Sequence, residues 1–293
     1  MANEPILYCD GTYVPESQAR LSAFDLGVQF GDGVYEVVSA WKGLVFRLDD
    51  HLDRLIDTLH AARIDTGLSR EDWRMIVRET AKRNGLTDAS IKIIVTRGLL
   101  APGNPDPRAA KPSVRAFATP YGHLGTAEQR AKGIRLQIGH QRGMAPDTLD
   151  PRYKHTSRLQ YQLAKIESLD SGYDDVVWLS AQGFLEEAPR SNLFLAKNGI
   201  LRTPSLGVLH GITRLTFCEL AAELGIPVET GALTAFDLFA ADEAFTCSTS
   251  GAALPIREAA GRVLRGGAPG PITDKLNALY WKKREAGWHG TPI

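Results

Sequence analysis

The pattern of apolar and polar residues is typical of β-strands in some stretches and of helices in others. Strand-like stretches separated by turn residues predict hairpins near the start of the chain. Asp10-Gly11 separates two short runs, Ile6 to Cys9 and Thr12 to Val14, and Asp-Gly favours the positive φ angles of a tight turn. The stretch Val34 to Phe46 is rich in β-branched and aromatic residues and is interrupted at Lys42-Gly43. We therefore expect a second hairpin there.

The helical period follows, with recognisable start and stop signals. Asp49 is a candidate N-cap for a helix whose apolar residues recur at helical spacing. Ser69 and Asp72 resemble a capping box, and Asn84-Gly85 is a typical helix end. The strands expected after it are Ile91 to Thr96, Val114 to Ala118, Ile134 to Ile138, Val176 to Leu179, Asn192 to Ala196, Ile200 to Arg202 and Glu243 to Cys247.

Three further helices are expected in the second half. One runs from about Ser157 to Leu169, with leucines and an isoleucine on one side, one from Gly211 to Leu224, and one from Thr273 to Glu285. Hairpins mixed with helices indicate two α+β domains. Turn and polar residues at 121–132 mark an interdomain loop, so we expect an N-terminal domain of residues 1–120 and a C-terminal domain of residues 133–293.

Composition narrows the class of protein. The chain has 293 residues, 43% of them hydrophobic, and 34 basic residues balance 34 acidic ones. This balance gives no indication of nucleic acid or of an anionic membrane surface as a partner. The three cysteines are far apart, and neither a signal peptide nor an apolar run of membrane-spanning length is recognised, so a reducing cytoplasm is the expected compartment.

One lysine and one acidic segment carry the candidate chemistry. Lys154 precedes an apolar-periodic run, and Glu186 and Glu187 follow about thirty residues later beside an expected strand. A lysine amine, a carboxylate beside a pyridine nitrogen and a phosphate cradle are what a pyridoxal phosphate site requires. Extended alternation would turn only one of the two glutamates inward, and spacing alone does not say which. A surface lysine and a solvated acidic turn are the structural alternatives.

Two threonine-containing turns could supply the phosphate cradle. Gly211, Ile212 and Thr213 stand at an expected helix N-terminus, where amide groups and the helix dipole favour a phosphate. Thr249-Ser250-Gly251 follows a strand and offers a second set of hydroxyls and amides. An ordinary helix cap and an ordinary turn are the alternatives.

Other ligand motifs are not recognised. The seven histidines lack metal-ligand spacing, so no metal is expected, and the chain has no P-loop and no GxGxxG. Phe30 to Val34 is rich in glycine, but it leads into a hairpin rather than a helix, which argues against a nucleotide fingerprint.

Seven ordered motifs together resemble the class IV, or fold type IV, pyridoxal-phosphate transaminases, from Ile6 to Trp281. They are QFGDGVYEVV (29–38), FRLDDHLDRL (46–55), VTRG (95–98), the lysine segment, EEAPRSNLF (186–194), GVLHGITR (207–214) and CSTSGAALPI (247–256). The resemblance implies a two-domain α+β fold like that of the D-amino-acid and branched-chain aminotransferases. It also implies that residues 133–293 form a pseudobarrel carrying the cofactor lysine.

The resemblance also implies roles for single residues. Lys154 matches the lysine that forms the Schiff base, and Glu187 matches the acid at the pyridine nitrogen. Tyr35 matches an active-site tyrosine near the substrate. The other cofactor-binding matches, for the phosphate and one face of the ring, are Arg54, Leu209, Ile212, Thr213 and Thr249.

The implied reaction is ping-pong transamination by a homodimer. Motifs near Tyr35 resemble D-amino-acid transaminases, but their Arg-x-His carboxylate pair is missing after the TRG motif. The C-terminal motifs resemble (R)-selective amine transaminases instead. We therefore expect a D-amino acid, an (R)-primary amine or both as donor, and pyruvate or 2-oxoglutarate as acceptor. A branched-chain L-amino-acid transaminase and an aminodeoxychorismate-lyase-type eliminase are the alternatives.

Two arginines are candidates for a substrate carboxylate. Arg97 and Arg108 bound a Pro- and Gly-rich segment that is expected to be a mobile loop at the mouth of the site. A planar guanidinium binds a carboxylate through two parallel hydrogen bonds. Either arginine is therefore expected to swing in when substrate binds.

Overall fold

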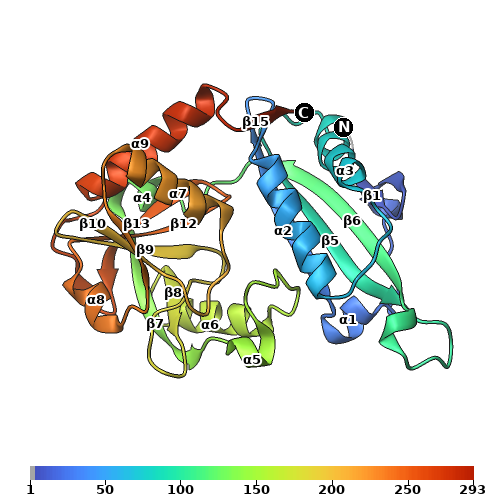
Figure 1. The fold of residues 1–293 in the computed structure, drawn as a ribbon, viewed down its shortest axis with the longest axis horizontal. Helices are drawn as coiled ribbons and strands as arrows, with labels where there is room; N and C mark the ends of the chain where they lie inside the picture. The colour runs from blue at the N-terminus through green and yellow to red at the C-terminus, as the bar shows by residue number, and fades with distance from the viewer. Residues whose placement is uncertain (1–3) are drawn as a thin grey trace. The chain divides into compact units, whose positions relative to one another are not determined.

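The structure is a computed structural model that describes residues 4–293, and it mixes helices with β-sheets, as expected for an α+β fold (Figure 1). Backbone contacts divide it into two compact units. Unit 1 contains the chain up to Gly122 together with Tyr153–Arg158 and Arg284–Ile293, and unit 2 contains His123–Arg152 and Leu159–Lys283. Lys154 thus belongs to unit 1 by its contacts, whereas the sequence placed it in a C-terminal domain of residues 133–293.

Unit 1 is built on one sheet with the strand order β15-β4-β3-β5-β6-β1-β2. Its strands are β1 Ile6–Cys9, β2 Thr12–Pro15, β3 Gly33–Trp41, β4 Leu44–Phe46, β5 Ala89–Leu99, β6 Lys111–Pro120 and β15 Gly290–Pro292. Its helices are α1 Leu26–Phe30, α2 Leu48–Ala61 and α3 Arg70–Arg83, with short 3-10 turns at Glu16–Gln18 and Pro107–Ala109. Apolar side chains of α2 and α3 pack with those of β3 and β5 in one core.

Local turn and cap chemistry agrees with most sequence expectations in unit 1. Both hairpins are confirmed, and their turns adopt positive φ at Asp10, Gly11, Lys42 and Gly43. The capping box of Ser69 and Asp72 is also confirmed. The cap proposed at Asp49 is wrong, because α2 begins at Leu48 and Arg47, in a left-handed conformation, is its N-cap, two residues before Asp49.

Unit 2 is built on a mixed sheet with the order β11-β10-β9-β12-β13-β7-β8, and β14 pairs with β13. Its strands are β7 Ile134–Arg142, β8 Asp175–Leu179, β9 Asn192–Lys197, β10 Ile200–Pro204, β11 Val228–Gly231, β12 Glu243–Ser248, β13 Ala252–Ala259 and β14 Arg262–Val263. Its helices are α4 Ala127–Lys132, α5 Pro146–Leu149, α6 Leu159–Asp170, α7 Ile212–Glu223, α8 Ala235–Ala240 and α9 Pro271–Glu285, of which the last two residues belong to unit 1. The stretch 121–132 is therefore not a loop throughout, because Thr126 and Gln129 cap α4.

The expected helix after Lys154 is present as α6, but its apolar side is exposed. Leu159 is 73% exposed, and Leu163, Ile166 and Leu169 are about half exposed. The buried side of α6 carries Tyr161, Ala164 and Ser168 instead. Tyr161 packs edge-on against Trp178 of β8, so an aromatic contact rather than the leucines attaches the helix to its sheet.

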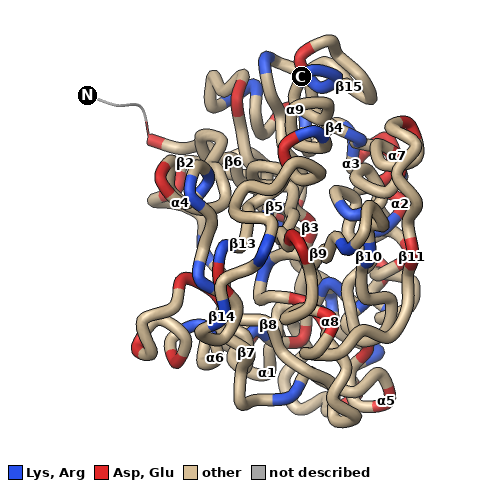
Figure 2. The backbone as a smooth tube through the Cα atoms, turned by 90° about the vertical axis from the view of Figure 1, so that its left-hand side faces the viewer, with Lys and Arg blue, Asp and Glu red and all other residues tan. Residues whose placement is uncertain are grey.

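Charge and hydropathy are unremarkable at this scale. Basic and acidic residues are interspersed along the backbone (Figure 2). No helix formed by residues 4–293 is long and apolar enough to cross a lipid bilayer.

Candidate active site

The segment that carries Lys154 is bonded to the start of β3 through its backbone. The Tyr35 N–H donates to the Lys154 carbonyl at 2.8 Å, and the Thr156 N–H donates to the Gly33 carbonyl at 2.8 Å. An isolated bridge between Val34 and His155 lies between these two bonds. The backbone on both sides of Lys154 is therefore fixed to the strand that carries Tyr35.

Glycines before β3 allow this close approach. Gly31 has a φ of 68°, and its carbonyl accepts hydrogen bonds from the hydroxyls of Thr156 and Ser157. A Cβ on Gly33 would lie 2.8 Å from the Val95 carbonyl oxygen, which is too close for any side chain. The glycine-rich motif thus seats the lysine segment, a role that sequence reasoning did not identify.

Two amines lie over the ring of Tyr35. The Lys154 Nζ is 4.7 Å from the ring centroid, and the Lys92 Nζ is 4.8 Å from it. Burial lowers the pKa of Lys92, and the positive charge of Arg158 lowers it further. Burial and the neighbouring charges of Arg158 and Lys154 lower the pKa of His155 to about 4, so this histidine is neutral at pH 7.

Arg54 is held by a buried carboxylate on the core side of the sheet. Its Nη2 and Nε donate to the two oxygens of Glu36 at 2.6 Å and 2.9 Å, and the ring of His51 lies 3.0 Å from Glu36 Oε1. Burial alone would raise the pKa of Glu36, but Arg54 and His51 outweigh it and hold that pKa well below its usual range. Arg54 is thus a fixed cation, and its contact with a phosphate stays a prediction.

Glu187 is oriented in unit 2 by two donors on one oxygen. Its Oε2 accepts from the Leu209 N–H and from the Asn192 side-chain amide, each at 3.0 Å. The same amide nitrogen of Asn192 donates to the Leu209 carbonyl at 2.8 Å. Asn192 therefore ties Glu187 to the loop before α7, and the sequence offered only its position five residues after Glu187 as a signal.

Glu186 occupies different surroundings from Glu187. A Cβ built on Gly143 would lie 1.5 Å from Glu186 Oε2, and one on Gly207 would lie 2.2 Å from Oε1. The carboxyl is buried in the space that these two glycines leave. Burial and the negative charge of Glu187 raise the pKa of Glu186 to about 8.

The first turn of α7 is shaped by the same network. Its N-cap is Gly211, which has no side chain to cap the first amides, and a Cβ there would lie 2.0 Å from Asn192 Oδ1. First-turn amides have no intrahelical acceptor, so those of Ile212 and Thr213 suit an anion. The turn with Thr249 lies just after Cys247, whose backbone pairs with Asn192 between β12 and β9.

The two arginines expected on a mobile loop are placed differently. Arg97 lies inside β5, and its guanidinium donates to Asp32 at 2.5 Å and to the carbonyls of Ala62 and Arg63. The expectation of a loop at Arg97 is therefore wrong, since the strand runs on to Leu99. Arg108 lies in a 3-10 turn with a 75% exposed side chain that is bonded to Asp106.

The expected site residues are divided between the two units. Unit 1 brings together Lys154, Tyr35 and the buried set of Glu36, His51 and Arg54. Unit 2 brings together Glu187, Leu209, Ile212, Thr213 and Thr249 around Asn192 and β12. Glu36, His51 and Asn192 are the supporting residues that sequence reasoning missed.

Comparison with known proteins identifies the family. Residues 33–259 match the family model described as amino-transferase class IV. A putative branched-chain-amino-acid aminotransferase of Methanocaldococcus jannaschii is 38% identical over 94% of this chain and 94% of its own length. A D-alanine aminotransferase of Bacillus licheniformis is 28% identical, with 91% of this chain and 93% of that protein covered.

Solved structures give the same grouping. The branched-chain amino acid aminotransferase of Escherichia coli superposes with a TM-score of 0.91 at 27% identity, covering 96% of this chain and 94% of that one. The branched-chain aminotransferase of Thermoproteus uzoniensis, solved with norvaline, has a TM-score of 0.90 at 30% identity, with 99% of each chain covered. A further enzyme of this name was solved with pyridoxamine 5'-phosphate.

Proposed function

Because this chain belongs to the class IV aminotransferase family, whose members use pyridoxal 5'-phosphate, we propose that its amino donor is a D-amino acid, an (R)-primary amine or both. A 2-keto acid such as pyruvate or 2-oxoglutarate accepts the amino group. The observation that carries this proposal is the fixed pairing of Lys154 with Tyr35 at the start of β3, within the motif that resembles D-amino-acid transaminases.

The described residues fit the cofactor in charge and hydrogen bonding. Lys154 would bind it covalently, and the oriented carboxylate of Glu187 suits a protonated ring nitrogen. The first-turn amides of α7, left uncapped by Gly211, suit its phosphate. Arg54, Thr213 and Thr249 would add charge and hydroxyl groups to the same phosphate. These roles remain proposals for the chain's own residues.

In the proposed mechanism, Lys154 is the general acid and base. When bound, the cofactor withdraws electrons from the α carbon of the substrate. The Lys154 amine would act as the base that takes the proton from that α carbon, and its ammonium form would hold the proton until it is returned. Glu187 keeps a positive charge at the ring nitrogen, and Asn192 and the Leu209 amide hold the carboxylate in place.

A branched-chain L-amino acid is the second candidate donor. The relatives and structures compared are mostly named branched-chain aminotransferases, which favours this alternative. The sequence around Tyr35 and the C-terminal motifs favour the first candidate. A panel of donors distinguishes the two candidate functions. The α-proton of a D-amino acid and that of an L-amino acid lie on opposite faces of the α carbon, so one base in a fixed position favours one enantiomer.

The cofactor assignment is tested with Lys154→Ala. The purified wild-type protein is expected to be yellow and to lose its colour on borohydride reduction, whereas Lys154→Ala forms no borohydride-stable adduct. Mass spectrometry of the reduced protein should find the cofactor on Lys154. A wild-type protein that takes up no added pyridoxal phosphate would refute the assignment.

The donor class is tested by half-reactions of the wild-type enzyme. Stopped-flow spectra would follow loss of the resting colour with D-alanine, (R)-1-phenylethylamine and L-leucine. We expect the first or second donor to react faster than L-leucine. Rapid reaction with L-leucine alone would establish the second candidate instead.

A homodimer is part of this proposal. The family resemblance implies it, and the exposed apolar side of α6 supports it, because four large apolar residues on one helix side are costly to leave in water.

A further inference from the structure

We infer that Lys92 is the residue that binds the carboxylate of the 2-keto acid substrate, and of any amino-acid donor. This inference rests on the proposed function, since it concerns substrates of the transamination. It assigns the substrate end of the site, for which the sequence suggested Arg97 or Arg108. Every version of the proposed reaction has a 2-keto acid acceptor, so the inference holds for either class of donor.

The position of Lys92 follows from the pairing of two central strands. Lys92 of β5 lies opposite Val37 of β3, and Tyr35 lies opposite Ile94. Residues two apart on paired strands share a face of the sheet and lie within reach of long side chains. Lys92 and Tyr35 accordingly meet, and the ring that lies 4.8 Å from the Lys92 amine also lies 4.7 Å from the Lys154 amine.

Lys92 lacks the acidic partner that a half-buried lysine normally has. Among residues 4–293, its ammonium makes no ion pair and no hydrogen bond with a carboxylate, and its contact is the ring of Tyr35. A cation over a tyrosine ring is stabilised only modestly. Burial and Arg158 both disfavour its charged form, as its lowered pKa indicates. An anion beside Lys92 would offset both effects.

The chemistry of a keto acid suits this arrangement. Its carboxylate is one bond from the carbonyl carbon, and that carbon must come within reach of the Lys154 amine. The Lys92 ammonium and the Lys154 amine both lie over the ring of Tyr35, so Lys92 is close enough to Lys154 to contact the carboxylate. Arg97 and Arg108 are already hydrogen-bonded to Asp32 and Asp106.

A lysine anchor also agrees with donors that lack a carboxylate. An ammonium is a compact charge on a flexible stem, whereas a guanidinium fork demands a planar partner in fixed geometry. Lys92 can therefore bind the keto acid in one half-reaction and leave room for an uncharged group in the other. A lysine at this position would therefore let one site bind the keto acid and an amine donor in successive half-reactions.

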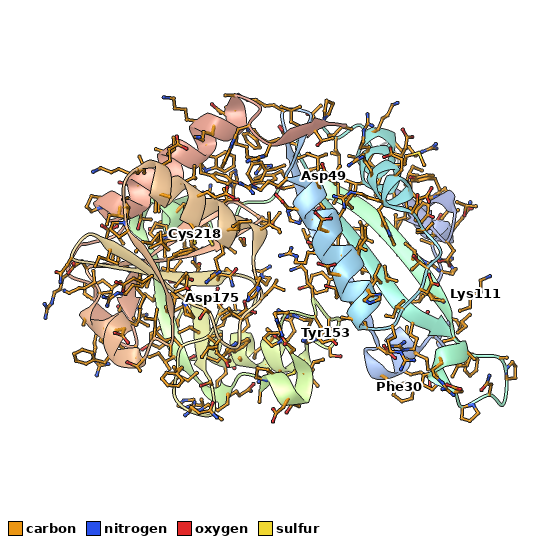
Figure 3. All side chains as sticks on the ribbon, in the orientation of Figure 1. Phe30, Asp49, Lys111, Tyr153, Asp175 and Cys218 are labelled. Atoms are coloured by element: carbon orange, nitrogen blue, oxygen red, sulfur yellow. The ribbon has the colours of Figure 1, made fainter. Side chains whose placement is uncertain are left out.

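The test compares the two half-reactions in three variants. Lys92→Met keeps the length of the side chain and removes its charge, Lys92→Arg keeps the charge, and Lys111→Met is the control, on β6 of the same unit (Figure 3). Stopped-flow kinetics would give kcat/KM for pyruvate and for (R)-1-phenylethylamine. We expect Lys92→Met to lower kcat/KM for pyruvate, relative to kcat/KM for (R)-1-phenylethylamine, about tenfold or more, because one charged hydrogen bond is lost. Lys92→Arg should restore part of it, and Lys111→Met should leave it unchanged.

A second measurement uses the unaltered protein. Reductive methylation followed by mass spectrometry would report how fast each lysine is modified, with and without 4-methylvalerate as a nonreactive carboxylate. Protection of Lys92 but not of Lys111 is expected. An unchanged ratio in a cofactor-loaded Lys92→Met, or equal modification of Lys92 with and without the carboxylate, would overturn the inference. A wild type without cofactor or half-reaction would instead refute the proposed function, and the protection of Lys92 would still be measured.

Discussion

Glu186 is a buried acid whose neutral form the fold favours. Its pKa is about 8 in the folded chain against an ordinary value of 4.5, because burial and the charge of Glu187 disfavour ionisation. Between these two values the folded protein binds more protons than the unfolded one. The free energy of unfolding must therefore fall as pH rises from about 4.5 to 8.

Glu186→Gln should remove this loss of stability. The amide has the shape of the protonated acid, so we expect the variant to gain about 2–4 kcal/mol over the wild type between pH 5 and pH 8.5. Chemical denaturation at both pH values would measure the difference. Glu128→Gln, an exposed residue on α4, should leave the pH slope as it is, and an identical slope in Glu186→Gln would mean that Glu186 is ionised in the folded chain.

Glu36 has the opposite character, as a fully buried carboxylate with two basic partners. Glu36→Gln would leave Arg54 and His51 without their anion, and breaking a buried pair costs about 3–5 kcal/mol of unfolding free energy. Urea denaturation at pH 7 would show this loss. Asp49→Asn is the matched surface control, since Asp49 also pairs with two arginines but is 60% exposed, and it should change stability by less than about 1 kcal/mol (Figure 3).

Single residues also mark what the sequence could not decide. Alternation left Glu186 and Glu187 equivalent, and both prove to be buried. Only the resemblance pointed to Glu187. The contacts that distinguish them come from Leu209, Asn192 and Gly143, which are distant in sequence from the pair or were not suspected of a role.

At the scale of elements, the start of α7 depends on a missing side chain. Gly211→Ala would drive a Cβ into Asn192 Oδ1 and displace the amide that holds Glu187. We expect the variant to bind pyridoxal phosphate at least tenfold more weakly, from the loss of about 1.4 kcal/mol or more. Fluorescence titration of the apoprotein would measure this affinity.

The control for that prediction lies in the same unit. Gly231 has no atom within 4 Å of an added Cβ and no positive φ, so Gly231→Ala should bind the cofactor as the wild type does. Equal affinity in Gly211→Ala would show that α7 does not contribute to the phosphate site.

Elements with local signals were predicted well, and those with remote partners were not. Glycine turns and the capping box of Ser69 and Asp72 depend on neighbours in sequence, so they were recognised. The side of α6 that faces its sheet was not predictable, because periodicity reports an apolar side without saying what covers it. The length of β5 was underestimated, because its pairing with β6 extends past Arg97.

At the scale of the molecule, the exposed leucines of α6 predict an assembly. Leu163→Glu combined with Ile166→Glu would place charges on the side that we expect a second copy to cover. Light scattering should find a dimer for the wild type and a monomer for the double variant, with the far-ultraviolet spectrum unchanged. Leu206→Glu, an exposed leucine outside α6, is the control. A double variant that remains dimeric would place the interface elsewhere.

A division into two parts was predictable from the order of expected strands and helices, but the course of the chain between the parts was not. Polar residues near 121–132 indicated the first passage between the units. The return of Tyr153–Arg158 to unit 1 depends on backbone bonds to Gly33 and Tyr35, and a backbone bond between segments about 120 residues apart cannot be read from residue identities. For this reason the sequence did not reveal that Lys154 shares its contacts with unit 1.

That return has a consequence for biosynthesis. A ribosome releases the strands β1 to β6 first, while the lysine segment, and later β15, which covers the edge of β4, are still unmade. When β6 emerges, β4 therefore still lacks its partner strand β15, and β3 still lacks its bonds to the lysine segment. Domains that fold during synthesis do so as units. We expect the sheet of unit 1 to be completed by β15 only after all of unit 2 has been synthesised, so a fragment that ends at Gly122 cannot stand in for unit 1.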